Sequence, residues 1–132
     1  MKRLIAILAI LISAASCSGR LERDFLESPE VRLSVDNRTL FVYDPLTCQM
    51  GYDATDCRFH VMKDNASDYY MLTLSKQPSS EGEHIKGDIS WTTSDSIENR
   101  KNIAFTVMKL EGDIIWLWNA DQRIAVCVKK LI

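Results

Sequence analysis

The sequence predicts an all-β domain of about eight antiparallel strands in sequential hairpins, folded as a small up-and-down barrel or a sandwich. From Val31 onward, apolar and polar residues alternate with a period of two, which is typical of half-buried strands. Turn-forming residues interrupt this alternation at short intervals, as hairpins require. Residues 31–132 show no long amphipathic helical pattern, which argues against a parallel sheet with crossover helices.

The first hairpin is predicted to turn at Asp36-Asn37, a dipeptide of the type favoured in two-residue loops. In that register Leu33 lies opposite Leu40. The apolar residues of both strands then share one face of the sheet, which supports the register.

A second hairpin is predicted across residues 64–67, with Phe59 opposite Leu74. The polar segment 94–101 is expected to contain one helical turn. The remaining strands are expected at 85–92, 103–110, 114–118 and 123–131.

The last hairpin carries apolar side chains on both faces. Ile115 and Leu117 share one face, whereas Trp116 and Trp118 share the other. A strand with two apolar faces is either buried on both sides or part of an interface. In one interpretation, apolar residues near the N-terminus cover the second face; these are Leu21, Phe25 and Leu26. In the other, that face binds a ligand or a partner through Trp116, Trp118 and Phe105, because tryptophan is favoured at interfaces.

The first 17 residues have the layout of a secretory signal. Lys2 and Arg3 precede an apolar run at 4–12, and small residues at 13–16 lead directly to Cys17. The apolar run is far shorter than the roughly 20 residues that a membrane-spanning helix needs.

Residues 14–17, Ala-Ala-Ser-Cys, resemble the lipobox of bacterial lipoproteins, although Ala14 stands where leucine is usual. The resemblance implies cleavage before Cys17 and acylation of that cysteine with the two or more chains that stable attachment needs. An ordinary secreted protein, cleaved near Ala15, is the alternative. The implied organisation is a signal peptide at 1–16, a lipidated cysteine with its tether at 17–30 and the β domain at 31–132.

The combination of a lipobox, a short charged tether and a β domain is similar to small uncharacterised lipoproteins of Bacteroides-like bacteria. Ser18 follows the cysteine where an inner-membrane retention signal would have Asp, which predicts delivery to the outer membrane. Residues 18–21 lack the acidic run of surface-exposed lipoproteins, so we expect the domain to face the periplasm. The tether either forms one or two helical turns ended by Ser28-Pro29 or stays extended, with a reach of about 40 Å.

The charge of the mature chain argues against a nucleic-acid partner. Of 16 basic residues, Lys2 and Arg3 leave with the signal, so 14 basic residues face 18 acidic ones and the net charge is −4. Phosphate backbones are bound by basic patches, and none is visible.

Three cysteines remain if Cys17 carries lipid. Cys48 and Cys57 flank the segment 49–56, which is rich in turn-forming residues, and we expect them to form a disulfide in an oxidising periplasm. Closing so short a loop would stabilise the fold by about 2.5 kcal/mol. Cys127 lies in an apolar strand and is expected to be a buried free thiol.

No arrangement of residues predicts catalysis, a metal or a cofactor. His60 and His84 are expected to face solvent, no serine nucleophile motif is present, and the Asp, Glu and His residues lack the spacing of zinc or calcium sites. Asp95-Ser96-Ile97 resembles the O-glycosylation site of Bacteroides-type bacteria, which implies modification of Ser96.

The expected function is therefore non-enzymatic binding of a protein or envelope component by a lipid-anchored domain, with the membrane as a partner through the anchor. Two alternatives stay open: a lipocalin-like carrier of a small molecule inside the barrel, and a periplasmic inhibitor protein similar to lipid-anchored lysozyme inhibitors. The oligomeric state is not predicted.

Overall fold

The computed structural model describes residues 21, 23–65 and 67–130. The predicted signal peptide and the predicted lipidation site, Cys17, lie outside the described residues. Within them the chain forms one short helix and a sheet of nine antiparallel strands, which confirms the all-β class. The elements are α2 (Arg23–Glu27), β1 (Arg32–Val35), β2 (Arg38–Val42), β3 (Cys48–Asp53), β4 (Arg58–Lys63), β5 (Tyr69–Leu74), β6 (His84–Thr92), β7 (Ile97–Glu111), β8 (Ile114–Asn119) and β9 (Ile124–Lys129).

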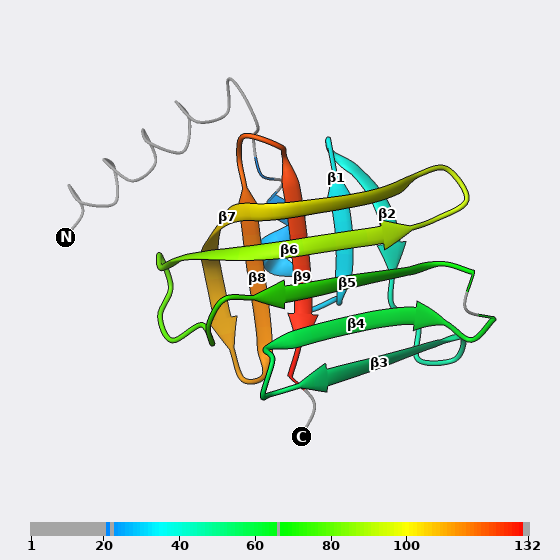
Figure 1. Cartoon of the computed structure of the whole chain (residues 1–132), viewed down its shortest axis with the longest axis horizontal. Helices are drawn as coiled ribbons and strands as arrows, with labels where there is room; N and C mark the ends of the chain where they lie inside the picture. Colours follow the sequence, from blue (N-terminus) through cyan, green and yellow to red (C-terminus); the bar gives the residue numbers. More distant parts are fainter. Residues whose placement is uncertain (1–20, 22, 66, 131–132) are drawn as a thin grey trace.

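The strands belong to one sheet that curls into a half-barrel (Figure 1). Its order is β2-β1-β9-β8-β7-β6-β5-β4-β3, so consecutive strands from β3 to β9 pair with each other. β1 returns to pair with β9, and β2 and β3 form the two edges. The topology is the up-and-down meander of hairpins that the sequence predicts.

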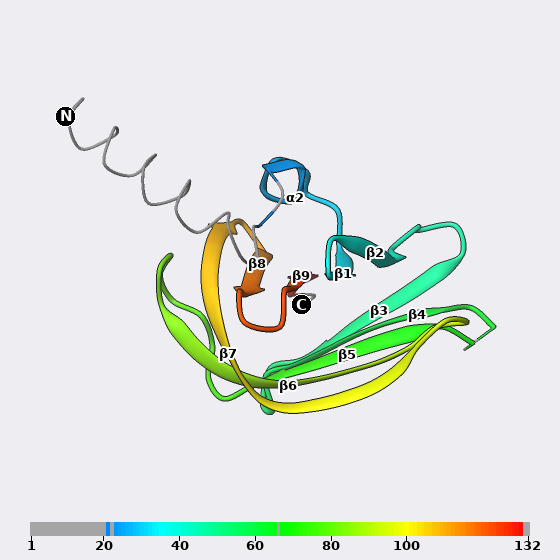
Figure 2. The same cartoon turned by 90° about the horizontal axis from the view of Figure 1, so that it is seen from above.

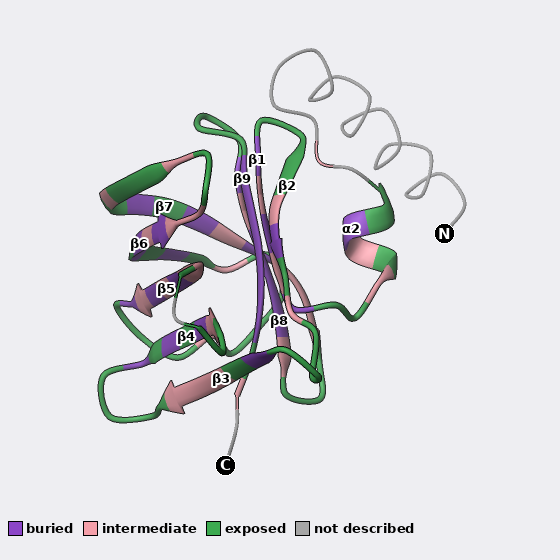
Figure 3. Ribbon diagram, turned by 90° about the vertical axis from the view of Figure 1, so that its right-hand side faces the viewer, coloured by how far each residue is buried: buried purple, intermediate pink, exposed green. Residues whose placement is uncertain are grey.

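Strand β7 is bent and belongs to both halves of the curl. Its 15 residues pair with β6 along the first part and with β8 along the second. The register with β8 shifts between Val107 and Lys109, and such a bulge bends a strand. Strands β3–β6 therefore run across β8, β9 and β1, and the two halves of the sheet face each other as layers (Figures 2 and 3).

The main core fills the space between these two halves. Its largest side chains are almost fully buried: Trp91, Tyr70, Phe59 and Phe105. The hydroxyl of Tyr70 donates a hydrogen bond to the carbonyl oxygen of Cys127 at 3.1 Å, so this buried polar group is satisfied. The interior of the curl is packed with side chains.

The first hairpin turns where the sequence predicts, but its register differs. Asp36 and Asn37 have φ angles of 55° and 63°, as a type I′ turn requires. A bulge next to Leu33 then places this residue opposite Phe41, so the predicted pairing with Leu40 is wrong. A bulge adds a residue to one strand, and the alternation of apolar and polar residues gives no sign of it. The strand register therefore could not be derived by counting residues outward from the turn.

Three further predictions need correction. Phe59 lies opposite Leu72, two residues from the predicted Leu74, and the shift by two keeps the same side chains on the core face. The helical turn predicted within 94–101 is wrong, because β7 already begins at Ile97. The segment 49–56, predicted as a loop, supplies most of a ninth strand, β3; as an edge strand with half-buried side chains it alternates only weakly.

Candidate functional site

Helix α2 covers the outer face of the last hairpin. Phe25 is 2% exposed and packs with Trp116 and Cys127, which are fully buried. Leu21 and Leu26 pack against the same cluster. Figure 3 shows the helix as a third layer beside β8, β9 and β1. The interpretation in which N-terminal apolar residues cover the second face is confirmed.

Polar contacts hold this cover in place. The indole N–H of Trp116 donates to the carbonyl oxygen of Ser28 at 3.2 Å. The ammonium of Lys109 donates to the carbonyl oxygen of Leu26 at 3.0 Å and lies 4.7 Å from the centre of the Trp116 ring. The helix ends before Ser28-Pro29, in agreement with the helical one of the two alternatives for this segment, because a residue that precedes proline avoids the helical conformation.

Next to the covered residues, one row of the outer face is covered only in part. Thr39, Ser34, Ala125 and Trp118 lie side by side across β2, β1, β9 and β8. Three of these side chains are short and the fourth is an indole, so the row forms a hollow with one tall wall. Helix α2 has five residues and is only about 7.5 Å long, too short to cover this row as well.

The result is a cavity of about 210 Å³ on the outside of the sheet, which we call the α2 pocket. Its floor and tall wall are the row just described. The remaining walls are Leu21, Asp24, Phe25, Arg32, Asn37 and Arg123.

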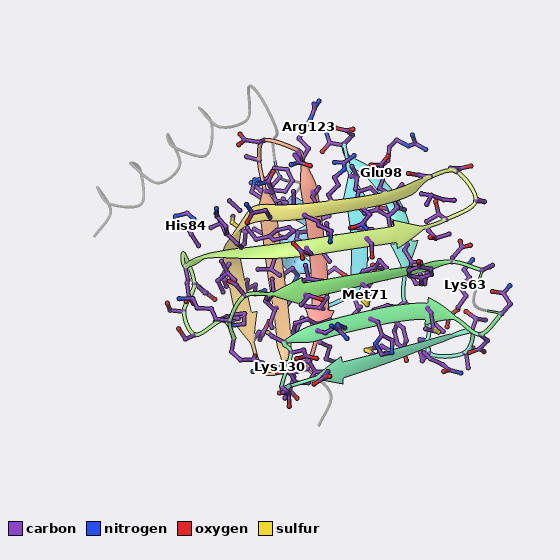
Figure 4. All side chains as sticks on the ribbon, viewed as in Figure 1. Lys63, Met71, His84, Glu98, Arg123 and Lys130 are labelled. Carbon is purple, nitrogen blue, oxygen red and sulfur yellow. The ribbon has the colours of Figure 1, made fainter. Side chains whose placement is uncertain are left out.

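Two arginines, Arg32 and Arg123, line the α2 pocket. The side chain of Arg32 is 15% exposed, lies 5.2 Å from the centre of the Phe25 ring and has Nη1 3.5 Å from the carboxylate of Glu30. Its Nε has no hydrogen-bond partner within the described residues, and an unsatisfied buried donor is uncommon. Arg123 is half-exposed at the end where β8 turns into β9 (Figure 4), with Nε 3.0 Å from the carboxylate of Asp36.

The structure separates the residues of the predicted partner surface. Trp118 is half-buried and lines the α2 pocket. Trp116 lies under α2, and Phe105 points into the main core, because its neighbour Thr106 is the residue that pairs with Trp118. A surface built from all three residues is therefore wrong, and only Trp118 stays accessible.

The predicted disulfide between Cys48 and Cys57 is also wrong. The two thiols are free, because they lie at opposite ends of the β3–β4 hairpin. Along β3 the separation from Cys48 to Asp53 is roughly 17 Å, whereas a disulfide needs Cα atoms less than about 7 Å apart. Cys127 is a buried free thiol as predicted, and burial raises its pKa to about 12.

The two histidines are exposed, as the sequence predicts. His84 lies at the start of β6 (Figure 4), and its Nδ1 is 3.2 Å from the hydroxyl of Thr106, the residue of β7 that pairs with Trp118. In the part of the chain that the structure describes, His, Cys, Asp and Glu side chains do not gather in groups of three or more that could hold a metal ion. Among the described helices, none is long and apolar enough to cross a membrane.

Ser96 lies in the turn between β6 and β7 and is half-buried. Its hydroxyl oxygen accepts a hydrogen bond from the indole N–H of Trp91 at 3.1 Å. O-glycosylation of Ser96 stays a prediction, on a hydroxyl that already has a partner.

Sequence reasoning missed the arginines of the pocket. In the alternating pattern Arg32 looks like an ordinary solvent-facing residue of β1. Its position beside Cys127, on a face that the tryptophans make apolar, follows from the pairing of β1 with β9, which no pattern in the sequence indicates.

The cover also shortens the predicted tether. Because Leu21 and α2 pack against the sheet, only residues 18–20 separate Cys17 from the packed part of the chain. Four residue steps span at most about 14 Å, in place of the 40 Å expected for a free segment.

The chain matches no protein-family model, and no curated protein and no solved structure shows significant similarity to it.

Proposed function

We propose that the chain is an exported envelope domain, anchored through lipid on Cys17, that binds an envelope component in the α2 pocket and does not catalyse a reaction. The observation that carries this proposal is the α2 pocket itself. It combines an accessible indole and two arginines in a lining of four apolar and six polar or charged residues, so it offers a ligand both apolar contact and hydrogen-bonding groups.

The position of the pocket in the chain supports the anchoring part of the proposal. Leu21 forms one wall, and Cys17 lies four residues before it. An acylated Cys17 would hold the pocket close to the membrane, where envelope components are concentrated. The orientation predicted from residues 18–21 places the domain on the periplasmic side of the outer membrane.

The lipocalin-like alternative expects a ligand inside the barrel. That position is filled by the buried side chains of the main core, including Tyr70 and Trp91. The α2 pocket, on the outer side of the sheet, is the better candidate for a ligand.

The experiment compares the wild-type chain with two threonine variants purified from their native envelope. Thr39→Trp fills the α2 pocket from an exposed position, and Thr73→Trp places the same ring on β5, outside the pocket. We expect a co-purifying protein or lipid, identified by mass spectrometry, to be lost in Thr39→Trp and kept in Thr73→Trp.

Equal retention in both variants would contradict the pocket as the binding site. The anchor is tested separately by the intact mass of the chain. Acyl groups should be present on Cys17 and absent in Cys17→Ser, which should also leave the membrane fraction.

A further inference from the structure

We propose that the α2 pocket docks onto the membrane that carries the anchor and takes the phosphate group of a phospholipid headgroup between Arg32 and Arg123. The inference rests on the proposed lipid anchor and names the partner of the same pocket. It is argued from the charge of the pocket, from its unsatisfied donor and from the length of chain that separates it from Cys17.

The first argument is chemical. Guanidinium groups present several N–H donors in a planar fork that fits phosphate oxygens. The ion pair of Arg32 with Glu30 uses Nη1 at 3.5 Å, and the pair of Arg123 with Asp36 uses Nε. The buried Nε of Arg32 has no hydrogen-bond partner in the described residues, so one donor of this guanidinium group is unsatisfied.

The second argument concerns the acidic wall of the pocket. Asp24 lines the same cavity as the two arginines. A phosphoethanolamine headgroup carries a phosphate for the arginines and an ammonium for a carboxylate. The mixed charges of the pocket therefore fit a phospholipid headgroup better than a simple anion.

The third argument is reach. Leu21 lines the pocket, and the three residues 18–20 allow at most about 14 Å between Leu21 and an acylated Cys17. The anchor would thus keep the pocket next to headgroups at a high effective concentration, and even a weak headgroup site would be filled. The outer face with α2 is then the side of the domain that faces the lipid.

The test uses the full lipidated protein in vesicles of phosphatidylethanolamine and phosphatidylglycerol that contain a headgroup-labelled quencher lipid. Trp118 is half-buried in the pocket, whereas Trp91 and Trp116 are at most 1% exposed. The difference in fluorescence quenching between the wild type and Trp118→Phe therefore gives the contribution of Trp118 alone. We expect Trp118 to be quenched.

Arg123→Gln and Arg58→Gln are the matched pair. The side chains of Arg123 and Arg58 are 50% and 45% exposed, and each has an aspartate partner, but Arg58 lies on β4, away from the pocket. Arg123→Gln should lower the ratio of docked to undocked protein about fivefold, whereas Arg58→Gln should leave it unchanged. Higher salt should also weaken docking.

The contradicting outcomes are distinct. Trp118 that stays unquenched on an acylated, vesicle-bound protein, or equal quenching in Arg123→Gln and Arg58→Gln, would overturn headgroup docking and leave the anchor in place. Inorganic phosphate that shifts Trp118 emission as much as vesicles do would show a site for free anions. A mature chain without acyl groups would remove the proposed anchor and the docking together.

Discussion

The β8–β9 hairpin has an apolar inner face and an apolar outer face, and the two are covered in different ways. The inner face meets the other half of the sheet, and large buried side chains occupy the space between them. In the described residues, the outer face meets Leu21 and a helix of five residues, which bury Trp116 and Cys127 and cover the next row only in part. A sheet can close over an entire face, whereas one short helix covers a patch. The edge of that patch is where the α2 pocket forms.

The largest effect is expected in the inner core. Phe105→Ala removes a fully buried ring between the two sheet halves and should lower the free energy of unfolding by about 3–5 kcal/mol in urea titrations. Met71→Ala, on the outward side of β5, is the control and should cost about 1 kcal/mol or less. A similar decrease in the free energy of unfolding for both variants would contradict the assignment of Phe105 to the packed core.

A smaller effect is expected under the helix. Phe25→Ala should lower the free energy of unfolding by about 1.5–3 kcal/mol, because it removes one buried ring from the α2 cover. In the described residues, the helix segment is joined to the sheet by this small cluster and a few polar contacts, so its release should be local and should expose Trp116 to acrylamide quenching before the domain unfolds. Glu27→Ala, an exposed change in the same helix, is the control. A single cooperative transition without early exposure of Trp116 would show that α2 belongs to the main folding unit.

The smallest effect is expected in acid, on the loop before β6. Glu83 accepts hydrogen bonds from Lys76 and from the backbone and hydroxyl of Ser79, and these contacts lower its pKa to about 2. Because the folded-state pKa is below the unfolded value of 4.5, the stabilisation is complete above pH 4.5 and is lost as the pH falls toward 2.

Glu83→Gln should therefore be less stable than the wild type at neutral pH, and the difference should shrink between pH 4.5 and 2. A stability difference that does not change with pH would contradict the role of the carboxylate.

Local chemistry explains which parts of the fold could be predicted. Asp36 and Asn37 select a type I′ turn through their own backbone preferences, and the alternation of Phe59 and Val61 assigns them to the core face. Bulges such as the one beside Leu33 cannot be recognised from the alternation of apolar and polar residues, so the predicted strand register differs from the observed one. The edge strand β3 was missed because Met50 and Tyr52 are only half-buried, and the wrong Cys48–Cys57 pairing followed from that error.

The sequence by itself determined the β class, the hairpin order and the apolar character of both faces of the last hairpin, because these depend on residues near one another in the chain. Only the tertiary structure decided which interpretation of Trp116 and Trp118 holds. Phe25 and Trp116 are far apart in sequence, and their contact depends on where Ser28-Pro29 directs the chain after α2. The pairing of strands that are distant in sequence also brings Arg32, Arg123 and Trp118 to one pocket, and no local sequence pattern indicates that these residues lie close together.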